Sequence, residues 1–290
     1  IQEGIRETIN IAVNEKNWAW LNNFKIPNGV HVYGQRFAPF GPQNYPDELR
    51  KTEEMTEVRE RAIWAALNGQ FFDIEAEDSK THPLPDVPTN YTLSAKNGTV
   101  DYMPGSDSVS KIETAEGYRM ELFASEKEFP DLANPSQIAF DNQGRLWVAT
   151  MPSYPHYQIG DPKPADKLLI FEDADSDGKA DSLRVFADDL HIPIGFEIAP
   201  EGVYVSQSDS LVLLKDVDGD DKYDEREYIL SGFDDHDTHH AISAFSVDPS
   251  GAIIMGEGYF LHSNIETIYG PERGSWGGYF RYDPSRRKLD

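Results

Sequence analysis

Two hydrophobic patterns divide the chain into a helical part and a strand-rich part. Over the first 70 residues, apolar side chains recur about every three or four positions. The first stripe is Ile1, Ile5, Ile9 and Val13, and the second is Leu49, Met55, Val58, Ala62 and Ala65. This spacing places apolar side chains on one face of a helix. It predicts two amphipathic helices, joined by a loop over about residues 27–45, with the second ending at Gly69.

The periodicity disappears between about residues 72 and 110. This stretch is rich in Pro, Asp, Ser, Thr and Asn, which favour turns and loops over regular elements. We therefore expect three parts: a helical segment at 1–71, an irregular connector at 72–116, and a larger domain at 117–290.

From Gly117 onward, short apolar runs alternate with turns. A strand, a turn and a second strand occur at residues 136–150, 196–207 and 245–256, with turn glycines at Gly144, Gly202 and Gly251. Such spacing is typical of propeller blades. Further strand pairs are expected at 168–172 and 183–186, at 211–214 and 228–230, and in the last segment at 277–282. The chain is predicted to be mainly β, an incomplete β-propeller of about three to four blades, with additional polypeptide supplying the remaining ones.

An acidic nine-residue pattern occurs twice, each time between two predicted strands. Carboxylates at positions 1, 3, 5 and 9 could converge on calcium, a hard ion that takes six to eight oxygen ligands. The candidate ligands are Asp173, Asp175, Asp177 and Asp181 in the first loop, and Asp216, Asp218, Asp220 and Asp224 in the second, with Glu227 at position 12. We expect calcium-binding hairpin tips where one blade leads into the next. The alternative is an acidic turn that binds no ion.

The two loops depart from an EF-hand in different ways. Position 6 is Gly178 in the first loop but Asp221 in the second, and position 12 of the first loop is Arg184. Neither loop is flanked by predicted helices. The role of a bound ion would therefore be structural.

The composition limits the classes of molecule that this chain is expected to bind. The chain has 26 basic and 51 acidic residues, a formal charge of −25, which disfavours nucleic acid and anionic membranes but suits cations. It has no cysteine, so these residues offer no disulfide, thiol nucleophile or attachment point for c-type haem. No apolar run is long enough to span a membrane. Because the sequence begins at Ile1 without a Met or signal peptide, we expect a piece of a longer protein.

A second candidate site lies in residues 234–240. Asp237, His239 and His240 are the candidate catalytic residues, because clustered imidazoles and carboxylates can act as a base or bind a transition metal. Adjacent residues on a strand point to opposite faces, so both histidines can face one ion only if the backbone turns there. The alternative is that one histidine caps a loop near the central channel and the other packs in the sheet.

The ordered motifs of the strand-rich part resemble a known family. They lie at residues 117–124, 167–181, 203–207, 213–220, 237–240 and 277–282. Together they resemble the N-terminal propeller of large extracytoplasmic proteins of planctomycetes, verrucomicrobia and Bacteroidetes named as membrane-bound dehydrogenases. These are related to the sorbosone and soluble quinoprotein glucose dehydrogenases. The resemblance implies about six blades, pyrroloquinoline quinone chemistry on a sugar or aldehyde, and often a later cytochrome domain, whose Cys-x-x-Cys-His motif is absent here.

The helical part resembles the tail that follows the catalytic core of GDSL-type (SGNH) hydrolases fused to such propellers. The matching residues are 14–21, 32–34 and 61–69. The resemblance implies that the hydrolase nucleophile would lie upstream of Ile1.

Three functional hypotheses follow. The first is an extracytoplasmic quinoprotein-like dehydrogenase propeller that acts on sugars or aldehydes and has calcium-stapled loops. The second is a non-catalytic propeller that binds a glycan or a protein partner in a cell-surface complex. The third is the accessory region of a secreted GDSL-type esterase.

Overall fold

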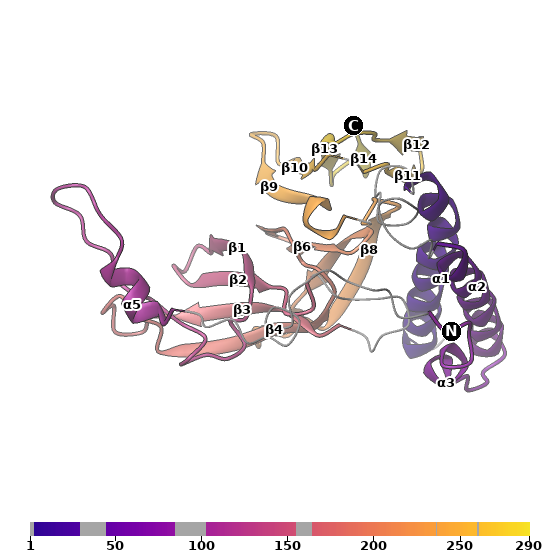
Figure 1. The fold of residues 1–290 in the computed structure, drawn as a ribbon, viewed down its shortest axis with the longest axis horizontal. Coiled ribbons are helices and arrows are strands. Elements are labelled where there is room, and N and C mark those ends of the chain that lie inside the picture. The colour runs from indigo at the N-terminus through magenta and orange to yellow at the C-terminus, as the bar shows by residue number, and fades with distance from the viewer. Residues whose placement is uncertain (1–2, 30–44, 85–102, 155–163, 236, 260) are drawn as a thin grey trace.

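A helical hairpin lies beside three four-stranded β-sheets in the computed structural model (Figure 1). The structure describes residues 3–29, 45–84, 103–154, 164–235, 237–259 and 261–290. Residues 32–34 and His236, much of the expected loop at 27–45 and the middle of the connector lie outside this description. Among the described helices, none is both long and apolar enough to cross a bilayer.

The two predicted helices are present as α1 (Glu3–Gly29) and α2 (Tyr45–Leu67). The expected apolar face of α2 is confirmed by four buried side chains: Met55, Val58, Ala62 and Ala65. In α1 the buried face differs from the predicted one: Ala12 is buried, whereas the neighbouring Val13, which was expected to be buried, is 37% exposed. The guanidinium of Arg59 is also buried and pairs with Glu15 of α1 at 3.3 Å. An ion pair therefore joins the two helices beside their apolar contact.

The connector contains two short helices that the sequence pattern did not predict. They are α3 (Ile74–Asp78) and α5 (Gly105–Ser110). Asp73 caps α3, because its side chain accepts a hydrogen bond of 2.9 Å from the amide of Ala76. Helices of five or six residues are too short to show a helical repeat of apolar positions, which explains why they were missed.

Three four-stranded antiparallel sheets form the blades of an incomplete β-propeller, which confirms the predicted fold class. The first blade contains β1 (Pro135–Phe140), β2 (Leu146–Thr150), β3 (Asp166–Glu172) and β4 (Ser182–Leu190). The second contains β5 (Phe196–Ala199), β6 (Gly202–Gln207), β7 (Ser210–Lys215) and β8 (Glu225–Ser231). The third contains β9 (Ser243–Val247), β10 (Ile253–Glu257), β13 (Gly278–Asp283) and β14 (Lys288–Leu289). A separate hairpin, β11 (Asn264–Thr267) and β12 (Gly270–Arg273), is inserted between β10 and β13.

The acidic loops lie within blades, and the prediction that they lead from one blade into the next is wrong. The first loop joins β3 to β4 and the second joins β7 to β8, the third and fourth strands of their sheets. The blades are linked instead by the segments between β4 and β5 and between β8 and β9. Both arrangements put an acidic turn between two strands, so the pattern alone could not distinguish them.

Both faces of the second blade are buried, each against a different neighbour. Alternate residues of a strand point to opposite faces, so Val203 and Val205 pack toward the first blade while Tyr204 packs toward the third. The contact with the first blade includes Trp147, Leu168, Ile170, Val212 and Leu214. The contact with the third includes Leu211, Leu213, Ile253, Met255, Phe280 and Tyr282.

The two end blades each present a face with no neighbouring blade among the described residues. On the first blade, the segment that contains Phe129 covers part of this face, and its ring meets Phe171 edge-on at 5.2 Å. The rest of that face exposes Ile138 and Phe140. On the third blade, Tyr279 is exposed. The helical hairpin lies at the outer strand β8 of the middle blade (Figure 1), where Ser231 donates a hydrogen bond of 3.3 Å to Asn14.

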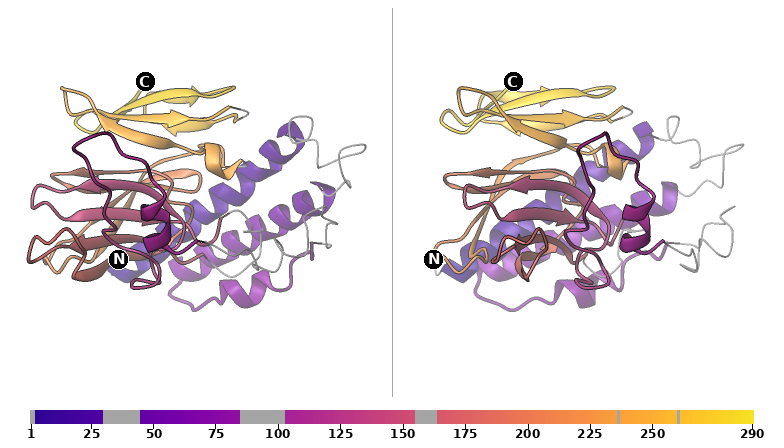
Figure 2. Two further views of the ribbon diagram at one scale, coloured as in Figure 1. Left: turned by 60° about the vertical axis from the view of Figure 1, so that its left-hand side comes forward. Right: turned by 90° about the vertical axis from the view of Figure 1, so that its left-hand side faces the viewer.

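The antiparallel order gives the blades two distinct ends (Figure 2). The turns that join the first strand of each blade to the second, and the acidic loops, lie at one end, which we name the turn face. The links between blades and the connection from β2 to β3 lie at the other end, which we name the link face. A 3-10 turn, η2 (Thr238–His240), precedes β9 on the link face. The two candidate sites are therefore on opposite faces.

The blade packing predicts unequal effects of one substitution at two positions of the first blade. Ile170 is 2% exposed between blades and Ile138 is 61% exposed. Ile170→Ala should lower the free energy of unfolding by about 2 to 5 kcal/mol, because it leaves a cavity. Ile138→Ala, the matched control, should change it by about 0.5 kcal/mol or less. Urea denaturation measures both, and equal losses would contradict the blade packing.

Candidate functional site

The two acidic loops have the same carboxylate arrangement. In each, oxygens from positions 1, 3 and 9 lie within 4.8 Å of one another. The residues are Asp173, Asp175 and Asp181 in the first loop, and Asp216, Asp218 and Asp224 in the second. The structure thus brings together six of the nine predicted metal ligands in two matching groups.

The position 1 carboxylate closes each loop by accepting backbone hydrogen bonds. Asp173 accepts one of 2.9 Å from the amide of Gly178, and Asp216 accepts one of 2.9 Å from the amide of Asp221. The position 5 residues Asp177 and Asp220 lie outside the three-residue groups and accept from the amide two residues further on. The loops are therefore held by their own backbone amides.

Like charges are concentrated in the second loop. The carboxylates of Asp220 and Asp224 raise the pKa of Asp218, because a negative neighbour disfavours ionisation. A cation between these side chains would relieve the same repulsion.

At position 6 of the second loop, Asp221 adopts the backbone conformation that usually requires glycine. Asp221 has φ 66°, in the left-handed region that Gly178 also occupies in the first loop. Its carboxylate accepts a hydrogen bond of 2.8 Å from Arg145 in the first blade and another from Arg184. Arg184 is the position 12 residue of the first loop, where an EF-hand would have a ligand. Both departures from the calcium pattern therefore form one ion-pair network between blades.

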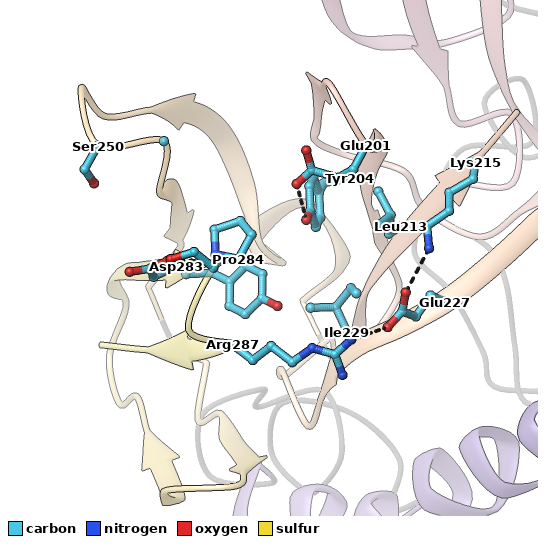
Figure 3. Close-up of a pocket in the computed structure, with 13 residues that line it drawn as sticks. Glu201, Tyr204, Leu213, Lys215, Glu227, Ile229, Ser250, Asp283, Pro284 and Arg287 are labelled. Carbon is cyan, nitrogen blue, oxygen red and sulfur yellow. Dashed lines mark hydrogen bonds and ion pairs between the residues drawn. The ribbon is translucent and has the colours of Figure 1, made fainter. Parts of the chain in front are cut away.

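Glu227 is separated from the carboxylate group of its loop. It pairs with Lys215 at 3.1 Å and with Arg287 at 3.2 Å (Figure 3). These residues line a cleft of about 460 Å³ between the second and third blades, together with Glu201 and Tyr282. Position 12 lies on β8, and the strand directs this side chain toward the neighbouring blade.

The candidate catalytic residues form a compact cluster on the link face. Nδ1 of His239 lies 2.9 Å from one carboxylate oxygen of Asp237, and Nδ1 of His240 lies 3.1 Å from the other. The two imidazole rings are 4.2 Å apart between centroids. The backbone turns at this point, because the amide of His240 donates a hydrogen bond of 2.8 Å to the carbonyl of Asp237. The turn that the adjacent histidines require is therefore present.

Two glycines fix the position of His240. A Cβ at Gly258 would lie 2.6 Å from the His240 side chain, and the Gly258 amide donates a hydrogen bond of 2.8 Å to the His240 carbonyl. Gly277, at φ 84°, approaches Gly258 so closely that a Cβ there would lie 2.9 Å from its backbone. Sequence reasoning missed both residues, because glycines also occur at ordinary turns and nothing in the pattern indicates this contact.

Tyr154 reaches the cluster from the first blade. Its hydroxyl lies 3.4 Å from Nδ1 of His239, and the two rings meet edge-on. Tyr154 follows β2, whereas His239 belongs to the link that leads into the third blade. The sequence carries no signal for this contact, because about 85 positions separate the two residues and only the stacking of the blades brings them together.

Aromatic rings are exposed next to the cluster. Tyr259 follows Gly258 and lies 5.4 Å from the ring of Trp276, which is also 5.3 Å from His262. Tyr259 is 56% exposed and Trp276 is 47% exposed. Trp276, which directly precedes Gly277, has φ 66°. This backbone conformation is strained for a bulky residue.

Buried carboxylates organise the link face. Asp166 is fully buried and accepts hydrogen bonds from the amides of Ser153 at 3.0 Å and Ile192 at 2.8 Å. Asp234 is also buried and accepts one of 2.8 Å from the amide of His262. These bonds connect the loops that carry Tyr154 and His262 to the blades. The carboxylates of Asp166 and Asp234 also give this face an acidic character.

Comparison with known proteins connects the propeller part to one family. A family model described as a domain of unknown function, DUF7133, matches residues 104–290. No curated protein sequence matches the chain.

Three solved structures are similar to parts of the chain. A carbohydrate-active enzyme of family AA12 from Trichoderma reesei is 16% identical with a TM-score of 0.36, over 50% of this chain and 34% of that one. A luciferin-regenerating enzyme is 11% identical with a TM-score of 0.33, over 48% and 45%. A proposed gluconolactonase is 20% identical with a TM-score of 0.30, over 49% and 46%. The matched part is less than half the length of each of these proteins.

The network around Arg145 predicts a pH-dependent contribution to stability. Burial alone would raise the pKa of Asp141, but hydrogen bonds from Trp147 and Arg145 lower it below its usual value. Because the folded pKa is depressed, the stabilisation is present above the unfolded pKa of about 4 and is lost as the pH falls through the folded pKa.

Asp141→Asn should therefore lower the free energy of unfolding by about 1 to 3 kcal/mol at pH 7. It should also flatten the loss of stability below pH of about 4. Asp188→Asn, at an exposed position of the same blade, is the control and should leave both unchanged. Urea denaturation at several pH values measures them, and an unchanged acid slope in Asp141→Asn would contradict this assignment.

Proposed function

We propose that this chain, which belongs to the DUF7133 family of unknown function, supplies three blades of an extracytoplasmic oxidoreductase propeller that acts on sugars or aldehydes. The observation that carries the proposal is the convergence of Asp237, His239 and His240 on the link face. The motif resemblance to quinoprotein-type propellers agrees with it. The remaining blades would come from further polypeptide.

The cluster suits the oxidation of a hydroxyl or hydrated aldehyde group. This reaction removes the hydroxyl proton while the carbon loses a hydrogen with two electrons, so it needs a base beside the reacting oxygen. A neutral imidazole is a suitable base near neutral pH. Asp237 would hold the rings in place and stabilise the imidazolium that forms. Tyr154, beside His239, offers a hydroxyl that could orient the substrate.

The surroundings favour a neutral, polar substrate. The exposed rings of Tyr259 and Trp276 offer apolar surfaces next to the cluster, where the C–H face of a sugar ring could stack. The carboxylates of Asp234 and Asp237 would repel an anionic substrate. An uncharged aldose or aldehyde fits both features.

The implied acceptor, pyrroloquinoline quinone, would take up two electrons when bound. The quinone carries three carboxylates, and the cluster with its neighbours Asp234 and Glu257 is acidic as well. These residues do not fit direct binding of an anionic quinone. We therefore expect its binding residues in the blades that complete the ring.

We also propose that each acidic loop binds one calcium ion. Three convergent carboxylates, together with carbonyls and water, suit this ion. The loops lie on the turn face, whereas the histidine cluster lies on the link face, so the ions would stabilise hairpins and would not contact the substrate. Asp221, held by Arg145 and Arg184, would transmit this stabilisation to the first blade.

A non-catalytic propeller that binds glycans is the second candidate. The exposed pair Tyr259 and Trp276 favours it, because aromatic surfaces bind sugars without any chemistry. The two functions differ in one measurement, since a binding protein retains sugar affinity but shows no turnover.

The oxidoreductase proposal predicts that the histidines control turnover. The test uses the full-length protein with added quinone and calcium, and follows dye reduction with aldoses and aldehydes. The combined variant His239→Gln and His240→Gln should lower kcat by about 100-fold or more, because the base is lost. His262→Gln, on the same face but outside the cluster, is the matched control and should retain most of the activity. Sugar binding by the full-length protein without dye reduction would favour the second candidate.

The calcium proposal predicts about two ions per chain after dialysis. Asp173→Asn with Asp181→Asn should remove one of them, and Asp216→Asn with Asp224→Asn should remove the other. Elemental analysis measures the ions, and calcium should raise the Tm of the unaltered protein more than that of either variant, because it binds only the folded loops. Asp188→Asn is the control. Dialysed protein without bound calcium would contradict the proposal.

A further inference from the structure

We propose that Asp237, His239 and His240 form a binding site for a divalent transition-metal ion such as zinc. The proposal deepens the proposed function, because it concerns the same cluster and rests on its placement on the link face. The proposed metal site differs from the calcium loops in the chemistry of its ligands. It also concerns binding, which can be measured without turnover.

The separations between the imidazole nitrogens and the Asp237 oxygens match those between two ligands of one ion. Ligands about 2.0 to 2.1 Å from a metal are about 2.9 Å apart at a right angle and about 3.3 Å apart at the tetrahedral angle. Nδ1 of His239 and Nδ1 of His240 lie 2.9 Å and 3.1 Å from the two oxygens of Asp237. One ligand atom of each residue also falls within 4.8 Å of the others. Three convergent donors are therefore in place without rearrangement of the backbone.

The local backbone explains how adjacent histidines share one site. In η2 the chain turns, closed by the hydrogen bond from the His240 amide to the Asp237 carbonyl, so His239 and His240 are both directed back at Asp237. Gly258 then limits the His240 ring, since a Cβ there would lie 2.6 Å from it. A fixed ring reduces the entropy lost on binding.

The ligand set selects a class of ion. Imidazole suits zinc, copper, iron and nickel, whereas sites made only of carboxylate and carbonyl oxygens suit calcium and magnesium. The cluster has two imidazoles and one carboxylate, and the acidic loops have carboxylates alone. The two kinds of site lie on opposite faces of the blades. Millimolar calcium should therefore saturate the loops without competing for the cluster.

The site leaves room for a further ligand. Two histidines and one carboxylate supply three donors, as in catalytic zinc sites, in which water or substrate takes the fourth position. His239 is half-exposed and His240 is partly buried, so solvent reaches the cluster from one side. With both imidazoles as metal ligands, the ion would take over the role assigned to the base: a substrate hydroxyl bound to it would lose its proton more readily, because a metal ion lowers the pKa of oxygen ligands.

The test is a titration of the chelator-treated full chain with Zn²⁺ and Co²⁺ in millimolar calcium, by calorimetry and by the visible absorption of bound Co²⁺. We expect one ion per chain. His239→Gln, His240→Gln and Asp237→Asn should each lower the affinity about tenfold or more, because each removes a donor. The control His262→Gln should bind as the unaltered chain does.

A second pair of variants tests the positioning of the ring. Gly258→Ala should weaken Zn²⁺ binding, because the added Cβ displaces the His240 side chain, whereas Gly278→Ala, which meets nothing within 4 Å, should not. Absence of Zn²⁺ and Co²⁺ binding would overturn the proposal and would identify the contacts to Asp237 as ion pairs only. Binding that survives loss of both histidines, or that is equally weakened by His262→Gln, would overturn it too.

These outcomes are distinguishable from those of the proposed function. Zn²⁺ binding by the cluster without sugar oxidation would support the metal site and contradict the oxidoreductase. Sugar oxidation by a chain that binds neither Zn²⁺ nor Co²⁺ would support the oxidoreductase and contradict the metal site.

Discussion

Burial of both faces of the middle blade is the interaction on which the rest of the structure depends. A strand alternates its side chains between two faces, so β6 directs Val203 and Val205 to one neighbour and Tyr204 to the other. Each apolar face needs a partner, because exposing it to water costs free energy in proportion to its area. The first and third blades are therefore fixed on either side of the second, and the loops of all three take their positions from this stack.

The stack separates two kinds of chemistry. Antiparallel strands bring the turns between the first and second strands and the acidic loops to one end, and the interblade links to the other. The oxygen-rich loops thereby lie on the turn face, where Asp221, Arg145 and Arg184 tie two blades together. The imidazoles lie on the link face, where His239 from one link meets Tyr154 from the connection in another blade. The proposed calcium loops and the proposed substrate site can then be changed independently.

Predictions from the sequence succeeded where the cause is local. The strand pairs followed from apolar runs around Gly144, Gly202 and Gly251, all of which have the positive φ that such turns require. They failed where a contact with another element decides. The buried side of α1 shifted to Ala12, the acidic loops proved to lie within blades, and the side chain of Glu227 is paired with Arg287 of the next blade.

The sequence by itself determined the mainly β class, the blade-like repeat, the two acidic loops and the identity of the histidine–carboxylate cluster, because each depends on residues close together in the chain. Only the tertiary structure decided which face each group occupies, that η2 directs both His239 and His240 at Asp237, and that Gly258 and Tyr154 complete the cluster. The turn at η2 is local, but Gly258 meets His240 only when the third blade folds, and Tyr154 meets His239 only when the blades stack. No pattern within one segment encodes these two contacts.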